Sequence, residues 1–204
     1  MKAARWNERY GALGYAYGTA PNQFFKEQLS LLPPGRILLP ADGEGRNAVY
    51  AATQGWEVYA FDQSEAGQQK ALELAAKRGV EINFAVYNSP ELPYPLEYFD
   101  AIALIYAHFM PAQRTAFHKQ FMKLLRPGGT LILEAFNKGH LPYKKANPSV
   151  GGPGDEQVLM SLAELTDDFS GLNATLAKDE IVELAEGDYH RGTGSVVRLT
   201  GWKS

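Results

Sequence analysis

Short apolar runs alternate with amphipathic segments along the first two thirds of the chain. Each run is bounded by turn residues, which is typical of strands buried in a parallel sheet. The intervening segments repeat apolar residues every three or four positions, as helices packed on a sheet do. This alternation favours right-handed crossovers and a doubly wound α/β sheet. The predicted strands lie at 36–40, 56–62, 80–87, 98–107 and 130–136, and the predicted helices at 47–55, 64–79 and 111–125.

The alternation ends after the fifth predicted strand. Residues 139–155 are rich in glycine, proline and asparagine and are predicted to form a long loop. A short helix is expected near 161–169, and strand-like runs at 175–186 and 194–202 predict an antiparallel hairpin. We therefore expect one domain, with a Rossmann-like, doubly wound, seven-stranded sheet whose last strand is antiparallel. Its expected parts are an N-terminal helical lid (1–33), a cofactor-binding core (34–137), a flexible loop (138–160) and a C-terminal helix and hairpin (161–204).

Composition narrows the class of protein. Hydrophobic residues make up 45% of the 204 residues and charged residues 21%, which is typical of a globular protein with a sizeable core. The net charge of −3 argues against nucleic acid as a partner, and the longest apolar stretch, 101–107, is too short to cross a membrane. The N-terminus lacks the apolar core of a signal peptide, and the absence of cysteine fits a reducing cytoplasm. We expect a cytoplasmic protein, monomeric or weakly dimeric, that acts on a small molecule without a metal ion.

The turn "ADGEG" after the first strand raises two hypotheses about a bound nucleotide. Gly43 and Gly45 fit a dinucleotide fingerprint, with Asp62 at the place of the ribose-binding acid. The carboxylates of Asp42 and Glu44 would repel a pyrophosphate, whereas they are compatible with the positive charge of a sulfonium or an ammonium group. The glycines then let the backbone approach the aminoacyl part of an adenosine cofactor without phosphates. In both hypotheses Asp62 binds the ribose hydroxyls.

Several motifs resemble those of the class I S-adenosylmethionine-dependent methyltransferases, and together they cover nearly the whole chain. More narrowly, the chain is similar to the small bacterial methyltransferases of the tellurite-resistance and thiopurine methyltransferase type. The resemblance implies the class I methyltransferase fold, S-adenosyl-L-methionine as cofactor and a small-molecule methyl acceptor. The motifs are "WNERY" (6–10), "YGTAPNQF" (17–24), "GEGRNAVYAA" (43–52), "LLRPGGTLILEAF" (124–136), "GGPGD" (151–155) and "YHRG" (189–192).

The resemblance also implies which residues hold the cofactor, and three positions depart from the family pattern. Leu39 stands where an acid is usual and Ala41 where glycine is usual, so we expect Asp42 to supply the negative charge near the methionine end. Asn88 replaces an acid that faces the adenine amino group, and its carbonyl oxygen can still accept a hydrogen bond. The expected cofactor-binding residues are Ala41, Asp42, Gly43, Gly45, Asn47, Asp62, Gln63, Asn88 and Ile105.

The methyl-transfer pocket is implied to lie beside the end of the fourth strand. Tyr106 and His108 are the candidates for a catalytic base, although a histidine at this place also occurs as a simple hydrogen-bonding cap of the strand end. Aromatic residues crowd the first 25 positions, where a lid could exclude water. The expected lid and substrate residues are Trp6, Tyr10, Tyr17, Phe109, His190 and Arg191.

Methyl transfer is an in-line displacement at carbon, so the protein mainly has to align the acceptor and exclude water. A soft nucleophile, such as a thiolate or a chalcogen oxyanion, needs little help from a base, and we expect a soft acceptor, a thiol or a chalcogen oxyanion. Two alternatives stay open. One is an NAD(P)-dependent oxidoreductase, which the lack of a Tyr-x-x-x-Lys pair disfavours. The other is a non-catalytic S-adenosylmethionine-binding regulatory protein, which the departures at Leu39 and Asn88 suggest.

Overall fold

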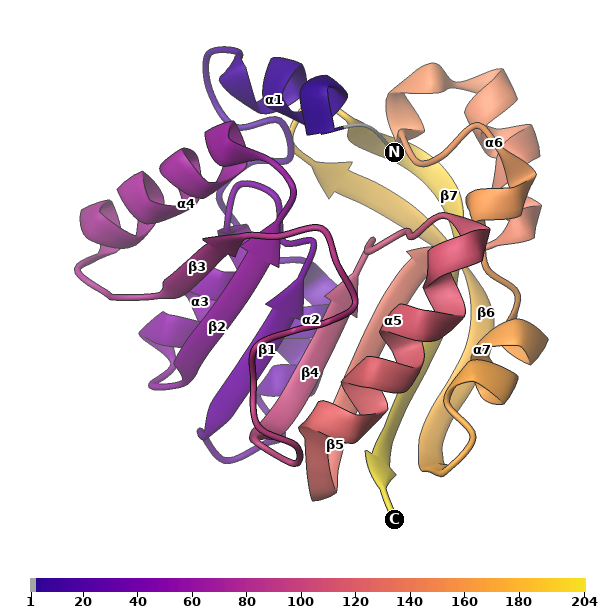
Figure 1. Ribbon diagram of the computed structural model, residues 1–204. Coiled ribbons are helices and arrows are strands. Elements are labelled where there is room, and N and C mark those ends of the chain that lie inside the picture. The colour runs from indigo at the N-terminus through magenta and orange to yellow at the C-terminus, as the bar shows by residue number, and fades with distance from the viewer. Residues whose placement is uncertain (1–2) are drawn as a thin grey trace.

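Seven strands form the central sheet of the protein, in the order β3-β2-β1-β4-β5-β7-β6 (Figure 1). The computed structural model describes residues 3–204. Strands β1 to β5 run parallel, and β7 pairs antiparallel with both β5 and β6. The predicted fold class is therefore confirmed. The strands are β1 (Arg36–Pro40), β2 (Glu57–Asp62), β3 (Asn83–Val86), β4 (Phe99–Ile105), β5 (Leu125–Phe136), β6 (Leu172–Glu186) and β7 (His190–Lys203).

Helices cover both faces of this sheet, and alternate strand residues face the two cores. In β1, Leu38 belongs to the core that α5 and α7 complete, whereas Ile37 and Leu39 belong to the core that α2, α3 and α4 complete. Burial on both faces explains why the strands are continuous apolar runs. No helix within residues 3–204 has the length and apolar character that a membrane span requires. The helices are α1 (Ala3–Gly11), α2 (Gln23–Leu29), α3 (Arg46–Thr53), α4 (Glu65–Arg78), α5 (Pro111–Leu124), α6 (Leu141–Ala146) and α7 (Leu162–Asp168).

Residues 139–155 do not form the long loop that their composition predicts. They contain α6 and are packed down: Val150 is fully buried, and Lys144 donates hydrogen bonds to the carbonyls of Gly151 and Gly152. Each helical piece is only one or two turns long, too short for an apolar periodicity to show in the sequence. Three-residue 3-10 turns lie at Lys138–His140, Pro148–Val150 and Glu156–Val158.

The carboxyl ends of the parallel strands define where a ligand can bind. β1 lies between β2 and β4, and the connections from these strands cover opposite faces of the sheet, so the strand order reverses at this point. Ligands of open α/β sheets bind outside the carboxyl ends at such a switch point. The segments after Pro40, Asp62 and Ile105 open there, and Figure 1 shows α1 and α6 beside this end of the sheet.

Candidate functional site

The turn between β1 and α3 depends on an unusual backbone conformation. Ala41, Gly43 and Gly45 have positive φ angles of 54°, 59° and 81°, which glycine adopts freely and alanine seldom does. A Cβ atom on Gly43 would also lie 2.6 Å from the Tyr10 hydroxyl. The turn thus brings bare backbone against the lid, and Ala41 takes the conformation of the glycine that the family pattern has at its position.

Asp42 binds the N-terminal turn of α3. Its carboxylate accepts hydrogen bonds from the backbone N–H of Ala48 (3.0 Å) and from the side-chain amide of Asn47 (3.2 Å), and it takes the place of a cap that Gly45 cannot supply. Burial outweighs these hydrogen bonds and raises the pKa of Asp42 to about 7. Because Asp42 also lines the cavity described below, a cationic ligand group beside it would favour its ionised form.

Glu44, the second acid of the turn, is committed to the protein itself. Its carboxylate accepts a hydrogen bond from the backbone N–H of Ala16 (2.7 Å) and pairs with Lys70 (2.9 Å). Lys70 also donates to the carbonyl of Ala12 (2.7 Å). Glu44 therefore anchors the segment that follows α1 to the turn, and its charge is balanced within the fold.

Asp62 and Gln63 at the end of β2 have acceptor capacity to spare. The Asp62 carboxylate accepts one hydrogen bond at each oxygen, from the backbone N–H of Gly43 (3.1 Å) and of Ser64 (3.0 Å), so one lone pair per oxygen is left. Burial raises the pKa of Asp62 to about 6. The Gln63 Oε1 atom is buried and has no hydrogen-bond partner among the described residues. Such an acceptor without a partner fits a ligand that has hydrogen-bond donors. The hydroxyls and amino groups of S-adenosylmethionine are donors of this kind.

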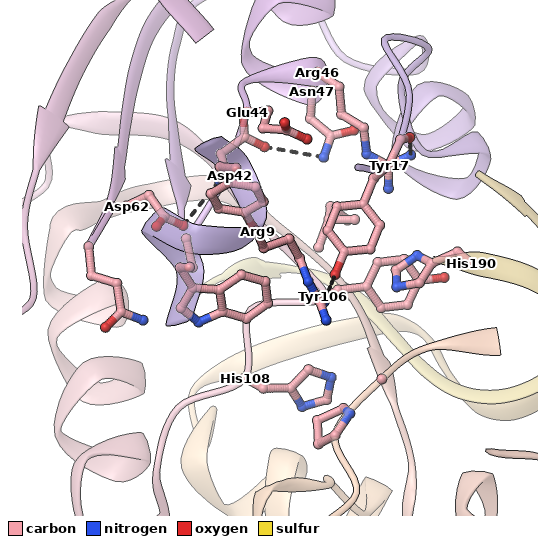
Figure 2. Close-up of a pocket in the computed structure, with 18 of the residues that line it drawn as sticks. Arg9, Tyr17, Asp42, Glu44, Arg46, Asn47, Asp62, Tyr106, His108 and His190 are labelled. Carbon is pink, nitrogen blue, oxygen red and sulfur yellow. Dashed lines mark hydrogen bonds between the residues drawn. The ribbon is translucent and has the colours of Figure 1, made fainter. Parts of the chain in front are cut away.

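These residues form one wall of a cavity of about 970 Å³, part of it open to solvent (Figure 2). The structure brings together most of the residues predicted for the site. The cavity is lined by Arg5, Trp6, Arg9, Tyr10, Tyr17, Gly18, Ala41, Asp42, Gly43, Glu44, Arg46, Asn47, Asp62, Gln63, Ile105, Tyr106, His108, Phe136, Gly152, Pro153 and His190.

Helix α1 and the segment after it cover this cavity. Trp6 stacks on Tyr10 with ring centroids 5.3 Å apart, and Tyr10 is buried against the turn. Arg9 donates a hydrogen bond to the Tyr17 hydroxyl (2.8 Å). Trp6, Arg9 and Tyr10 are spaced i, i+3 and i+4 and therefore share one face of α1. The three predicted lid aromatics do line the cavity.

Neither predicted catalytic residue has the chemistry of a base in this structure. The Tyr106 pKa is raised well above 10 by burial and by Glu134 and Glu186, so its phenol stays protonated. His108 shares a hydrogen bond of 3.1 Å between Nδ1 and the Val158 carbonyl, and its Nε2 accepts one from the backbone N–H of Phe136 (3.3 Å). Burial lowers the pKa of His108 to about 4. Both ring nitrogens are occupied, so His108 is the hydrogen-bonding cap of the strand end and not a base.

Of the two histidines that line the cavity, His190 is the one with a ring nitrogen that has no hydrogen-bond partner among the described residues. It begins β7 directly opposite Glu186, and its Nδ1 lies 2.8 Å from the Glu186 carboxylate. Although burial acts to raise it, hydrogen bonds from His190 and Arg46 hold the pKa of Glu186 at about 2. Burial lowers the pKa of His190, so its ring is neutral at pH 7, and its Nδ1–H donates to the Glu186 carboxylate. Nε2 of His190 is then left as an acceptor. The ring of Tyr106 packs against the imidazole, with the two ring centroids 4.6 Å apart, and holds its orientation.

Three predicted residues lie away from the main cavity. Asn88 and Phe109 line a smaller neighbouring cavity of about 430 Å³ that also reaches Gln63, and Phe109 stacks on Phe117 with ring centroids 4.2 Å apart. Arg191 is exposed and donates to the Gly187 carbonyl at the tip of the hairpin. The expectation that Arg191 contacts substrate is wrong for this arrangement, because its neighbour His190 points inward and successive strand residues face opposite ways.

Sequence reasoning missed three charged residues of the site. Arg9 lies within the "WNERY" motif on the same helix face as Trp6, a spacing that could have identified it. Arg46 is buried and pairs with Glu186 (2.8 Å). Glu186 faces His190 only through the register of the hairpin, and this register depends on a short turn whose length the sequence left open.

Comparisons with known proteins agree with this geometry. The model of a family described as a methyltransferase domain matches residues 37–129. Thiocyanate methyltransferase 1 of Brassica oleracea is 32% identical over 124 residues, which are 57% of this chain and 55% of that protein. The chain thus spans about half the length of the curated relative it matches.

Solved structures share the fold over almost the full chain. One is described as "Conversion of a Disulfide Bond into a Thioacetal Group during Echinomycin Biosynthesis"; it has a TM-score of 0.76 and 17% identity, covering 99% of this chain and 90% of that one. TehB from Haemophilus influenzae has a TM-score of 0.73 and 18% identity, covering 99% of this chain and 67% of that one. With the family match, the glycine turn and the acceptors of Asp62 and Gln63, S-adenosylmethionine is the cofactor that the site fits. Residues 37–129 therefore carry a methyltransferase domain, and the chain is similar to the class I S-adenosylmethionine-dependent methyltransferases in sequence over that part and in fold over nearly its whole length.

Proposed function

We propose that this protein transfers a methyl group from S-adenosylmethionine to a small molecule whose nucleophile is soft, a thiol or a chalcogen oxyanion. The observation that carries the proposal is the arrangement of two walls around one cavity. The glycine turn and Asp62 form one wall, and His190, backed by Glu186, forms another. The methyl donor and the acceptor would therefore meet beneath the lid, which shields them from much of the bulk water.

In this proposal the protein's own residues hold the cofactor at four places. Asp62 binds the ribose hydroxyls through its free lone pairs, and Gln63 Oε1 accepts a hydrogen bond at the adenine side. Gly43 gives the backbone access to the aminoacyl part, and Asp42 supplies negative charge to its ammonium group. Asp42 thus replaces the acid that Leu39 does not provide, since Leu39 is buried in the core.

When bound, S-adenosylmethionine supplies a methyl carbon on a sulfonium; the acceptor's lone pair forms the new bond to that carbon, and the old carbon–sulfur pair stays on the leaving thioether. For a thiol acceptor, the proton has to leave the sulfur. His190 Nε2 takes it, and the Glu186 carboxylate stabilises the imidazolium that results. Tyr106 and Phe136 pack against the His190 ring and hold its orientation. The name of the Brassica relative, a thiocyanate methyltransferase, is consistent with a sulfur nucleophile.

The test is transfer of a labelled methyl group to a panel of thiols, selenite and tellurite. We expect a labelled product with at least one of them, and we expect His190→Gln to lower kcat for thiols by roughly 100-fold. Glu186→Gln should lower kcat as well, whereas Glu183→Gln, on the exposed face of the same strand, should not.

The same panel separates the alternatives. Binding of S-adenosylhomocysteine without labelling of any acceptor would favour a regulatory protein over an enzyme. Binding of NADH without binding of S-adenosylhomocysteine would contradict both the cofactor and the proposed reaction.

A further inference from the structure

Arg9 is a cation inside the cavity without a carboxylate partner. Within residues 3–204 it makes no ion pair, and its side-chain hydrogen bond goes to the Tyr17 hydroxyl. A guanidinium has five N–H donors, so most of them are unused. Figure 2 shows the guanidinium pointing into the cavity, between Tyr17 and His108.

Aromatic rings hold this guanidinium in place. Its central carbon lies 4.3 Å from the ring centroid of Tyr189 and 5.3 Å from that of Trp6. Contacts of this kind fix a cation without neutralising its charge. The Arg9 side chain is therefore positioned and still able to bind an anion.

The acids around the cavity are already bound by other groups. Glu44 pairs with Lys70, and Glu186 pairs with Arg46 and His190. Asp42 and Asp62 accept backbone hydrogen bonds and lie on the cofactor wall. The charge that remains uncompensated on the lid side is positive.

Further positive charge lies near Arg9. Burial lowers the pKa of Lys144, and the charges of Arg5 and Arg9 add to this effect. Burial likewise lowers the pKa of His190, helped by the charges of Arg46 and Arg9. Arg9 is thus close enough to act on the residue that we assign as the base.

We propose that Arg9 selects the acceptor, by binding a negative charge that the acceptor carries beside its nucleophilic atom. The substrate class is then an anionic soft nucleophile, such as a mercaptocarboxylate or a chalcogen oxyanion. This proposal rests on the proposed methyl transfer and deepens it. Because Arg9 belongs to α1 and bonds to Tyr17, an anion bound there also ties the lid to the acceptor.

The test compares three thiols of similar size and different charge: mercaptoacetate, 2-mercaptoethanol and cysteamine. The release of S-adenosylhomocysteine gives kcat/KM for each thiol, and comparing the ratio between two thiols in a variant with the same ratio in the wild type cancels their intrinsic reactivity. We expect Arg9→Gln to lower the ratio of mercaptoacetate to mercaptoethanol about tenfold, the value of one charge-assisted hydrogen bond. Arg9→Lys should keep most of the preference, and Arg9→Glu should shift it toward cysteamine. Arg78→Gln, which removes an exposed arginine from α4, should leave the ratio unchanged.

A binding experiment separates this proposal from the reaction on which it rests. Methylthioacetate, the product from mercaptoacetate, is titrated into protein saturated with S-adenosylhomocysteine. If the wild type binds methylthioacetate and Arg9→Gln weakens this binding about tenfold, the anion site is supported. If no thiol is methylated in the same protein, only the proposed reaction fails. An Arg9→Gln variant that binds S-adenosylhomocysteine normally but loses turnover equally with all three thiols would overturn the proposal, as would absent binding of methylthioacetate to the wild type.

Discussion

The substitution Asp42→Asn measures how much the carboxylate in the turn between β1 and α3 lowers the free energy of unfolding. Asp42 accepts hydrogen bonds from the N–H of Ala48 and from Asn47, and burial raises its pKa from 3.8 to about 7. An amide keeps the hydrogen bond from Ala48 but presents an NH₂ group to the donor of Asn47. We expect that mismatch alone to cost the variant about 1 kcal/mol of stability at every pH.

The sign of the pH dependence follows from the raised pKa. The folded protein holds the Asp42 proton more tightly than the unfolded chain, so this stability is fully present below pH 3.8 and is lost as the pH rises to about 7. The whole pKa shift of Asp42 corresponds to about 4 kcal/mol of stability. This value is an upper limit, because solvent screens part of the half-buried carboxylate. Between pH 5 and pH 8 the wild type should therefore lose about 1 to 3 kcal/mol that Asp42→Asn does not lose.

Urea unfolding of the cofactor-free protein at pH 5 and pH 8 measures this difference. The comparison between the two proteins removes the contribution of Asp62, which is present in both. Asp42→Asn should gain stability relative to the wild type between pH 5 and pH 8 and should equal or exceed the wild type at pH 8. A stability difference that stays constant, or that grows in favour of the wild type as the pH rises, would refute the assignment of Asp42 as a carboxylate with a raised pKa.

Three further changes probe the cofactor and base sites. Gly43→Ala places a Cβ atom 2.6 Å from the Tyr10 hydroxyl at a positive φ, so calorimetry should show S-adenosylhomocysteine binding weakened at least about tenfold. Gln63→Met removes a buried acceptor without a described partner; thermal unfolding should show the empty protein no less stable, while S-adenosylhomocysteine binds more weakly. For His190→Gln, kcat/KM with a thiol should rise steadily with pH up to the pKa of the thiol, because only the thiolate then reacts. In the wild type it should be level above the lowered pKa of His190.

The fold could be predicted because the buried strands carry their signal locally. Leu38 and its neighbours are apolar on both faces, and the helices between the strands are long enough to show periodicity. The hairpin was also predicted, although β6 and β7 extend beyond the residues expected, because their polar outer faces hide their ends. The region 139–155 was not predicted, since helical pieces of one or two turns are stabilised by tertiary contacts such as those of Val150.

The cofactor wall of the site was predictable, and the acceptor wall was not. Asp42, Gly43 and Asp62 lie in short segments next to a strand end, so their sequence position already determines where they lie. The roles of His108 and His190 depend on partners 28 to 50 residues away or across a hairpin. Which of these two cavity histidines keeps a free nitrogen is decided by those partners.

That contrast bears on how the acceptor is chosen. The residues that we place against the acceptor come from α1, from the end of β4 and from the β6–β7 hairpin, and they meet only because the hairpin turn packs on the segment after α1. The backbone N–H of Asp188 donates to the carbonyl of Ala16 (3.0 Å), and a Cβ atom on Gly187 would lie 2.4 Å from that carbonyl. Arg9 and His190 are thereby held across one small space by elements at opposite ends of the chain. A change in either element can therefore alter the acceptor without disturbing the glycine turn.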